Sequence, residues 1–162
     1  MKVRIFVTGG TFDKIFDEVG GVMTFRDTHL YEMLDLVKNK LDIEIETVML
    51  VDSLYMKEDD RIKILEKCKS CKEDKIIITH GTDTMIETAK LLGKGIKDKT
   101  IVLTGATIPY SFGKSDALFN LGCAFGFVQL IEKGIYVTMN GTLFNYNNVK
   151  KNKEVGKFET IK

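Results

Sequence analysis

The chain has 162 residues with 24 Lys or Arg and 23 Asp or Glu, so its formal net charge is +1. This balance excludes a strong field that would attract nucleic acid or an anionic membrane, so we expect a small polar or zwitterionic ligand. The length suits one domain, residues 1–162. The sequence begins directly on an expected strand and has no run of 18 apolar residues, so we predict a cytoplasmic protein that does not span a membrane.

Five short apolar runs, rich in β-branched residues, predict the strands of one sheet. In chain order they span residues 3–7, 43–51, 76–78, 101–103 and 134–139. Continuous apolar character is typical of strands buried on both faces of a parallel sheet. Helical spacing between them predicts helices over residues 29–40, 58–72, 83–93 and 115–131. The alternation predicts an α/β fold with a three-layer, doubly wound, mostly parallel sheet of flavodoxin-like type.

Two segments carry weaker signals. Residues 11–28 hold Gly20-Gly21, mixed charges and no clean period, which predicts a long irregular connection. It could be a mobile loop that closes over a site or an ordinary surface loop. In the helix predicted over 58–72, Ile62, Leu65 and Cys68 are expected on one face. Cys68 and Cys71 have the spacing of redox and zinc motifs, but no second pair completes a tetrahedral site, so we predict no metal.

Three threonine-bearing segments directly follow predicted strands: Thr8-Gly-Gly-Thr11, Thr79-His-Gly-Thr-Asp-Thr84 and Thr104-Gly-Ala-Thr107. Ligands of doubly wound sheets bind at the carboxyl ends of the strands, so we expect these segments to gather there. Hydrolysis of an amide needs a nucleophile, a proton acceptor and donors for the oxyanion, all of which they could supply. Thr82 or Asp83 could equally be an N-cap. Neither GxGxxG nor GxxxxGK(S/T), the two glycine-rich motifs that bind phosphate groups, is present, which argues against a nucleotide site.

The combination of these segments resembles the bacterial-type L-asparaginases. Asp52-Ser53 falls where that family has its substrate-holding serine loop. Met139-Asn-Gly-Thr142, followed by Asn148-Val-Lys-Lys151, resembles the stretch that ends in the catalytic lysine. The resemblance runs from about residue 3 to residue 151. It implies the fold of the asparaginase N-terminal domain, without the C-terminal domain of full-length members, and a reaction that needs no cofactor.

The resemblance also implies roles for individual residues. Thr11 would attack the side-chain amide of L-asparagine, ammonia would leave, and water would release L-aspartate from an acyl-enzyme. The other catalytic residues would be Thr82, Asp83 and Lys151, with Lys150 an adjacent rival for the lysine. Asp83 would also hold the α-amino group, and Ser53, in the loop with Asp52, the α-carboxylate. The Ala106 carbonyl would accept a hydrogen bond from the leaving amide, and Gly10 and Gly81 would permit close backbone approach.

Two departures from the family pattern leave alternatives open. The family's mobile loop brings a tyrosine to the nucleophile, but the aromatic residues within 11–28 are all phenylalanines. Another group or water would therefore have to orient Thr11. Full-length members also complete their sites with a neighbouring subunit, and we expect a homo-oligomer, a dimer or tetramer. The alternatives are an amino-acid-binding or regulatory module without catalysis and the ammonia-supplying part of an amidotransferase. Preference between asparagine and glutamine stays open because it depends on one methylene.

Overall fold

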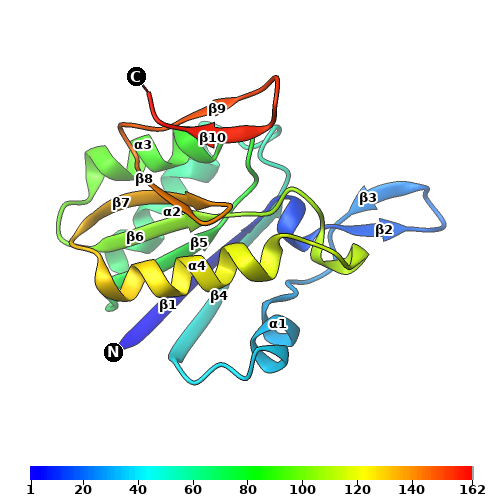
Figure 1. The fold of residues 1–162 in the computed structure, drawn as a ribbon, viewed down its shortest axis with the longest axis horizontal. Coiled ribbons are helices and arrows are strands. Elements are labelled where there is room, and N and C mark those ends of the chain that lie inside the picture. The colour runs from blue at the N-terminus through cyan, green and yellow to red at the C-terminus, as the bar shows by residue number, and fades with distance from the viewer. Residues whose placement is uncertain (162) are drawn as a thin grey trace.

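A six-stranded sheet forms the centre of the computed structural model, which describes residues 1–161. Its strand order is β4-β1-β5-β6-β7-β8 (Figure 1). The strands are β1 (Lys2–Gly9), β4 (Asp42–Val51), β5 (Lys75–Thr79), β6 (Thr100–Thr104), β7 (Gly134–Met139) and β8 (Thr142–Asn145). The first five are parallel, and β8 runs antiparallel to β7. Taken in chain order, the parallel strands have the 2-1-3-4-5 arrangement of flavodoxin-like sheets, which confirms the predicted fold class.

Four helices cover the two faces of this sheet (Figure 1). They are α1 (Leu30–Leu36), α2 (Glu58–Ser70), α3 (Met85–Gly95) and α4 (Ala117–Leu130). One core lies under α2 and α3, and a second lies under α1 and α4. Strand β5 shows the alternation, since Ile76 and Ile78 enter the first core and Ile77 enters the second. Both faces of the inner strands are therefore buried, which is why their sequences are apolar without interruption.

The helices differ from the prediction in two details. On α2 the buried face is formed by Ile64, Leu65 and Cys68, while Ile62 is 43% exposed. Ile62 lies about 200° around the helix from Ile64, so the two cannot face the same core. Helix α1 ends at Leu36, four residues earlier than predicted, and the chain then turns through Lys38 with φ of 52°.

The segment predicted as irregular contains regular structure. A short 3-10 helix, η1 (Thr11–Asp13), is followed by the antiparallel hairpin of β2 (Ile15–Asp17) and β3 (Val22–Thr24). The hairpin projects from the body of the molecule (Figure 1). Three more elements lie in the second half of the chain: η2 (Tyr110–Phe112), β9 (Lys150–Asn152) and β10 (Lys157–Glu159), the last two paired antiparallel.

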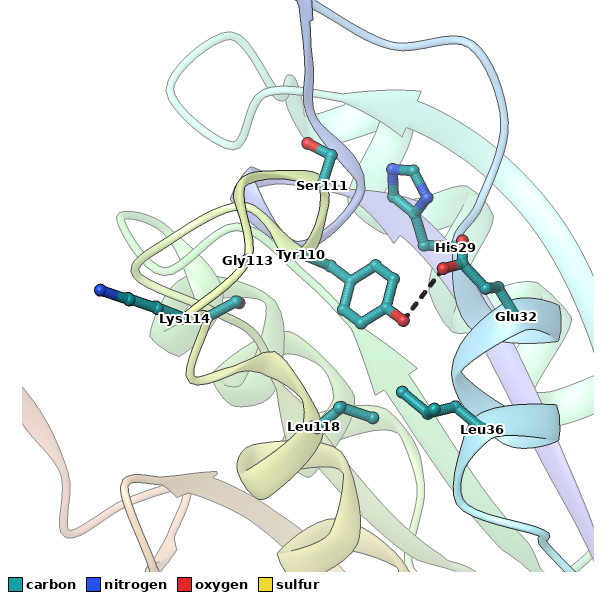
Figure 2. A pocket seen from close by; sticks show the side chains of 9 residues that line it. His29, Glu32, Leu36, Tyr110, Ser111, Gly113, Lys114 and Leu118 are labelled. Carbon is teal, nitrogen blue, oxygen red and sulfur yellow. Dashed lines mark hydrogen bonds between the residues drawn. The ribbon is translucent and has the colours of Figure 1, made fainter.

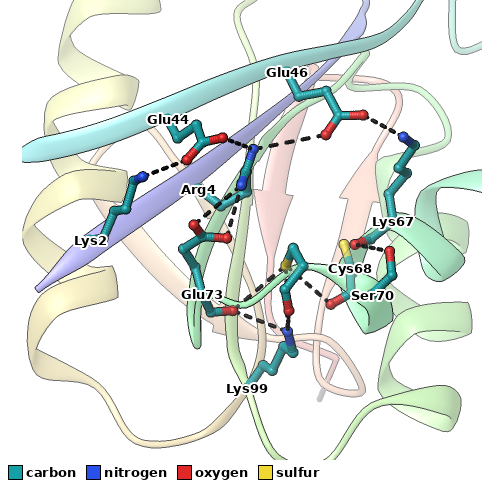
Figure 3. A network of polar contacts seen from close by, with 10 residues as sticks. Lys2, Arg4, Glu44, Glu46, Lys67, Cys68, Ser70, Glu73 and Lys99 are labelled. Atoms are coloured by element: carbon teal, nitrogen blue, oxygen red, sulfur yellow. Dashed lines mark hydrogen bonds and ion pairs between the residues drawn. The ribbon is translucent and has the colours of Figure 1, made fainter.

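A polar network joins the first strands at their amino-terminal edge (Figure 3). Arg4 donates two hydrogen bonds to Glu73, at 3.1 and 3.2 Å, and its third nitrogen lies 3.0 Å from Glu44. Burial would raise the pKa of Glu73, but its contact with Arg4 outweighs burial and lowers that pKa. The ammonium of Lys99 donates to the carbonyls of Cys71 and Glu73 just beyond the end of α2. These contacts occupy the edge of the sheet opposite the threonine segments.

The remaining features considered from the sequence are the cysteines, a metal site and a membrane-spanning helix. Cys68 is buried in the core, Cys71 is partly buried, and both are free thiols. No group of three or more His, Cys, Asp or Glu within residues 1–161 could hold a metal ion. No helix in that range is both long and apolar enough to cross a membrane.

Candidate active site

The predicted site residues lie at the carboxyl ends of four neighbouring strands. Gly10 and Thr11 follow β1, Asp52 and Ser53 follow β4, Gly81 to Asp83 follow β5, and Ala106 follows β6. Strands β1 and β5 are adjacent in the sheet, although β4 lies between them in sequence. This is the topological switch point of a flavodoxin-like sheet, where ligands bind in such folds.

Glycines let the loops after β1, β4 and β5 contact one another. A Cβ on Gly10, which has φ of 78°, would lie 2.3 Å from the backbone nitrogen of Gly81. A Cβ on Gly81 would lie 2.4 Å from the hydroxyl oxygen of Ser53. The sequence predicted glycines for close approach to substrate. The structure gives them an additional reason, because a side chain at either position would separate the loops.

A strand far along the chain brings Lys151 to the loop after β5. Its ammonium nitrogen lies 2.9 Å from the Thr82 hydroxyl and 2.7 Å from the Asp83 carboxylate. The Lys151 side chain is 16% exposed, whereas that of Asp83 is 45% exposed. Lys150 pairs instead with Glu159 of β10, at 3.5 Å. Successive side chains of a strand point to opposite faces, so only one of the two lysines can reach Thr82.

Ser53 presents a hydroxyl with nothing to bind. The residue is 1% exposed, and its Oγ has no hydrogen-bond partner among residues 1–161. A buried hydroxyl without a partner costs about 1–3 kcal/mol, so native proteins rarely keep one without a reason. The backbone around it is fixed, because Thr84 donates a 2.8 Å hydrogen bond to the Ser53 carbonyl. The arrangement suits recognition of a polar group on a ligand.

Asp52, which the sequence assigned to substrate binding, already has partners in the protein. One carboxylate oxygen accepts the Leu54 amide at 2.9 Å, and the other forms an ion pair with Lys14. Burial would raise the pKa of Asp52, but these hydrogen bonds outweigh burial and lower that pKa. Lys14 was not among the residues singled out from the sequence, because nothing there distinguishes it from a surface lysine.

His80 holds the loop after β5 from within the core. Its Nδ1 lies 2.8 Å from the Gly81 carbonyl oxygen, and its Nε2 lies 2.8 Å from the Thr88 hydroxyl. Because a carbonyl only accepts, Nδ1 carries the proton and Nε2 accepts from Thr88. Burial lowers the pKa of His80 to about 4, so the ring is neutral at pH 7. A neutral, fixed ring acts here as a support for Gly81.

Two polar residues between β6 and β7, Asp116 and Asn120, were also not singled out from the sequence. Asp116 accepts the amides of Thr107 and Ile108, at 2.9 and 3.0 Å, directly beyond Ala106. Asn120 donates to the Gly105 carbonyl at 2.9 Å and accepts the Asn140 amide at 2.9 Å. They fix the loop after β6 against the turn after β7. Their only sequence signal is polarity at the start of an otherwise apolar helix, which also fits a simple cap.

A pocket of about 600 Å³ lies between α1 and the loop after β6 (Figure 2). Tyr110 and Glu32 both line it, and the Tyr110 hydroxyl donates a hydrogen bond to the Glu32 carboxylate at 3.2 Å. None of the predicted site residues lines this pocket. Its lining residues are His29, Glu32, Leu36, Tyr110, Ser111, Gly113, Lys114, Ser115 and Leu118. We therefore place the candidate active site at the loop contacts described above and not in this pocket.

Comparison with known families identifies the family of the chain. A sequence model described as "Asparaginase, N-terminal" matches residues 2–161. The chain belongs to the asparaginase family. This asparaginase-family chain is 32% identical to L-asparaginase 2 of Escherichia coli over 174 residues, covering 99% of the chain and 49% of that protein. It is 29% identical to the L-asparaginase of Thermococcus kodakarensis, covering 96% of the chain and 49% of that protein.

Solved asparaginase structures share the fold of this family member. The thermostable L-asparaginase from Thermococcus kodakarensis superposes with a TM-score of 0.88 at 28% identity, over 99% of this chain and 51% of that one. The probable cytoplasmic L-asparaginase from Campylobacter jejuni gives a TM-score of 0.83 at 29% identity, over 98% and 52%. The chain thus spans about half the length of the relatives that it matches.

Proposed function

We propose that this asparaginase-family protein is an amidohydrolase that converts L-asparagine to L-aspartate and ammonia. The observation that carries the proposal is the contact of Lys151 with both Thr82 and Asp83, across 69 and 68 residues of sequence. It lies beside the unpartnered hydroxyl of Ser53 and at the same sheet edge as Thr11. Family membership supports the same reaction class.

In the proposed reaction Thr11 Oγ bonds to the side-chain amide carbon of asparagine. Its proton passes to the leaving nitrogen, ammonia departs, and an acyl-threonine ester remains. Water then attacks the ester, restores the Thr11 hydroxyl and releases aspartate. Lysine accepts a proton only as the neutral amine, so Lys151 could act as a base or could orient Thr82 while charged. A water molecule could also take the proton of Thr11.

Recognition of the amino acid follows from charge. The exposed Asp83 carboxylate would bind the α-ammonium, and the Ser53 hydroxyl would donate to the α-carboxylate. The carbonyl of the buried residue Ala106 would accept a hydrogen bond from the leaving amide. Asp52 would act through its loop, because Lys14 and Leu54 already occupy its carboxylate. Cytoplasmic location and assembly as a dimer or tetramer stay predictions.

The test is ammonia release from L-asparagine by the purified protein and by Thr11→Ala. We expect kcat of the variant to fall at least about 1,000-fold, because the acyl-threonine ester cannot form without the Thr11 hydroxyl. Thr142→Ala, at an exposed position of β8, should keep activity within twofold. L-Glutamine measured in parallel reports specificity. Undiminished turnover by Thr11→Ala would remove Thr11 as the nucleophile.

A second candidate is the ammonia-supplying part of an amidotransferase. The chain is 32% identical over 127 residues to a glutamyl-tRNA(Gln) amidotransferase component from Sulfurisphaera tokodaii, covering 74% of the chain and 28% of that protein. Such a protein would require a stable partner of a different sequence. Turnover by the isolated chain would favour the hydrolase. Binding of aspartate without turnover would favour a binding module instead.

A further inference from the structure

The residues on both sides of Thr11 are fixed by polar contacts. Before it, the Gly10 amide donates to the Val51 carbonyl at 3.0 Å, which joins the loop after β1 to the last residue of β4. After it, the fully buried Asp13 accepts the Thr28 hydroxyl and the His29 amide, each at 2.9 Å. Asp13 thus closes the base of the β2–β3 hairpin, because residues 13 and 28 are held together while the chain between them leaves the body.

Lys14 connects this segment to two further loops. Its ammonium pairs with Asp52, directly before Ser53, and its carbonyl accepts the Ser111 hydroxyl at 2.8 Å. The loops after β1, β4 and β6 therefore meet at one residue. The two charged side chains are 19% and 21% exposed. Lys14 lies three residues after Thr11 and at the end of η1, so its position constrains the turn that carries the Thr11 hydroxyl.

The hairpin beyond Lys14 has a different character. Phe16 and Met23 face each other across β2 and β3 and are 51% and 38% exposed, and Val19 at the tip is 98% exposed. Figure 1 shows the hairpin extending away from the sheet, whereas η1 lies against it. The contacts that hold residues 10, 13 and 14 beside Thr11 thus do not involve the hairpin residues 16–23.

We propose that Lys14 is a positioning residue, whose ion pair with Asp52 keeps the nucleophile segment 10–14 against the serine loop 52–54. It sets the backbone on both sides of Thr11 before substrate binds. The inference rests on the proposed function, because it presumes that Thr11 and Ser53 act on one substrate. An ion pair between partly exposed side chains contributes little to global stability. A displacement of about 1 Å between reacting groups, by contrast, costs on the order of 100-fold in rate.

The first test separates positioning from stability. Lys14→Met and Asp52→Asn should each lower kcat for L-asparagine about 10-fold to 100-fold while the thermal midpoint stays within a few degrees. Lys14→Arg, which keeps a cation that can pair with Asp52, should retain most of the parent kcat. Lys69→Met, which removes the exposed ion pair of Lys69 with Glu66, is the matched control and should leave kcat unchanged.

Three outcomes would overturn this role. Unchanged kcat in both single variants would show that the pair does not position Thr11. A loss of activity that follows a loss of folded protein would make the pair merely structural. A loss of kcat in Lys14→Arg as large as that in Lys14→Met, with the fold intact, would show that the ion pair is not what positions Thr11.

The second test does not depend on turnover. Amide hydrogen exchange of Gly10 should accelerate at least about 10-fold in Lys14→Met and stay unchanged in Lys69→Met, because the Gly10 bond to Val51 loses its support. A parent protein that releases no ammonia would reject the proposed function and leave this comparison valid. Unaltered exchange at Gly10 in Lys14→Met would reject the positioning role.

Discussion

At the scale of single residues, two adjacent lysines of β9 differ in what their ammonium groups contact. Lys151 reaches Thr82 and Asp83, and Lys150 reaches Glu159. Their sequence context, Lys150-Lys-Asn-Lys153, could not separate them, because a strand of three residues has no pattern that marks one face. The contact partners are 68 and 69 residues away, so only the fold identifies the lysine of the site.

This difference provides a matched pair of variants. Lys151→Met should lower kcat for L-asparagine at least about 100-fold, since a group that takes or relays a proton in the transition state contributes about 100-fold to 10,000-fold. Lys150→Met removes the same charge from the next residue and should stay within twofold of the parent. Initial rates of ammonia release at saturating substrate measure both. Equal losses in the two variants would mean that net charge, and not the Thr82 contact, matters.

At the scale of elements, the inner strands were predictable and the small ones were not. Residues 76–78 and 101–103 are apolar without interruption because helices cover both faces of β5 and β6. Strands β2, β3 and β9 have three residues each and stand outside the sheet, so they show neither continuous burial nor clear alternation. The loops that carry the site were predictable as loops. Their mutual contacts, such as that of Gly81 with Ser53, were not, because they depend on strand order.

Two glycines test what those loop contacts contribute. A Cβ at Gly81 would lie 2.4 Å from Ser53 Oγ, whereas a Cβ at the exposed Gly122 of α4 would have nothing within 4 Å. Gly81→Ala should lower the free energy of unfolding by about 1–3 kcal/mol through overpacking and raise KM by displacing Ser53. Gly122→Ala should raise that free energy by about 0.5–1 kcal/mol, because alanine favours the helix. Urea unfolding and steady-state kinetics give both quantities, and unchanged KM in Gly81→Ala would contradict the loop argument.

At the scale of the whole molecule, the class of fold was predictable because burial on both faces requires the inner strands to be apolar. The predicted strands located the threonine segments, family resemblance assigned roles to their residues, and the sheet topology explains why the segments meet. No local pattern marks the partners of four polar residues, which is why the sequence did not single them out: Asp13, Lys14, Asp116 and Asn120. Polar residues of this kind look like surface residues until the fold is known. Polar contacts between loops are therefore the part of the site that is hardest to predict from sequence.

Acid sensitivity of the whole fold should depend on His80. Its pKa falls from 6.5 to about 4 on folding, mainly because burial disfavours the charged ring, with a smaller effect of Arg61. Above pH 6.5 the ring is neutral in both the folded and the unfolded chain. Between pH 6.5 and pH 4 only the unfolded chain binds the proton, so the free energy of unfolding declines as pH falls. From these two values, His80 alone should remove about 2 kcal/mol between about pH 7.5 and pH 5.

Urea unfolding of the parent and of His80→Asn across this range isolates that contribution, because the carboxylates titrate in both proteins. The variant is expected to be less stable at the upper end of the range, since it loses the acceptor for Thr88, but its stability should decline less toward the acid end. Parallel curves for the parent and His80→Asn would mean that the ring gains its proton in the folded protein as readily as in the unfolded chain. The buried, neutral support for Gly81 inferred from its two hydrogen bonds would then be wrong.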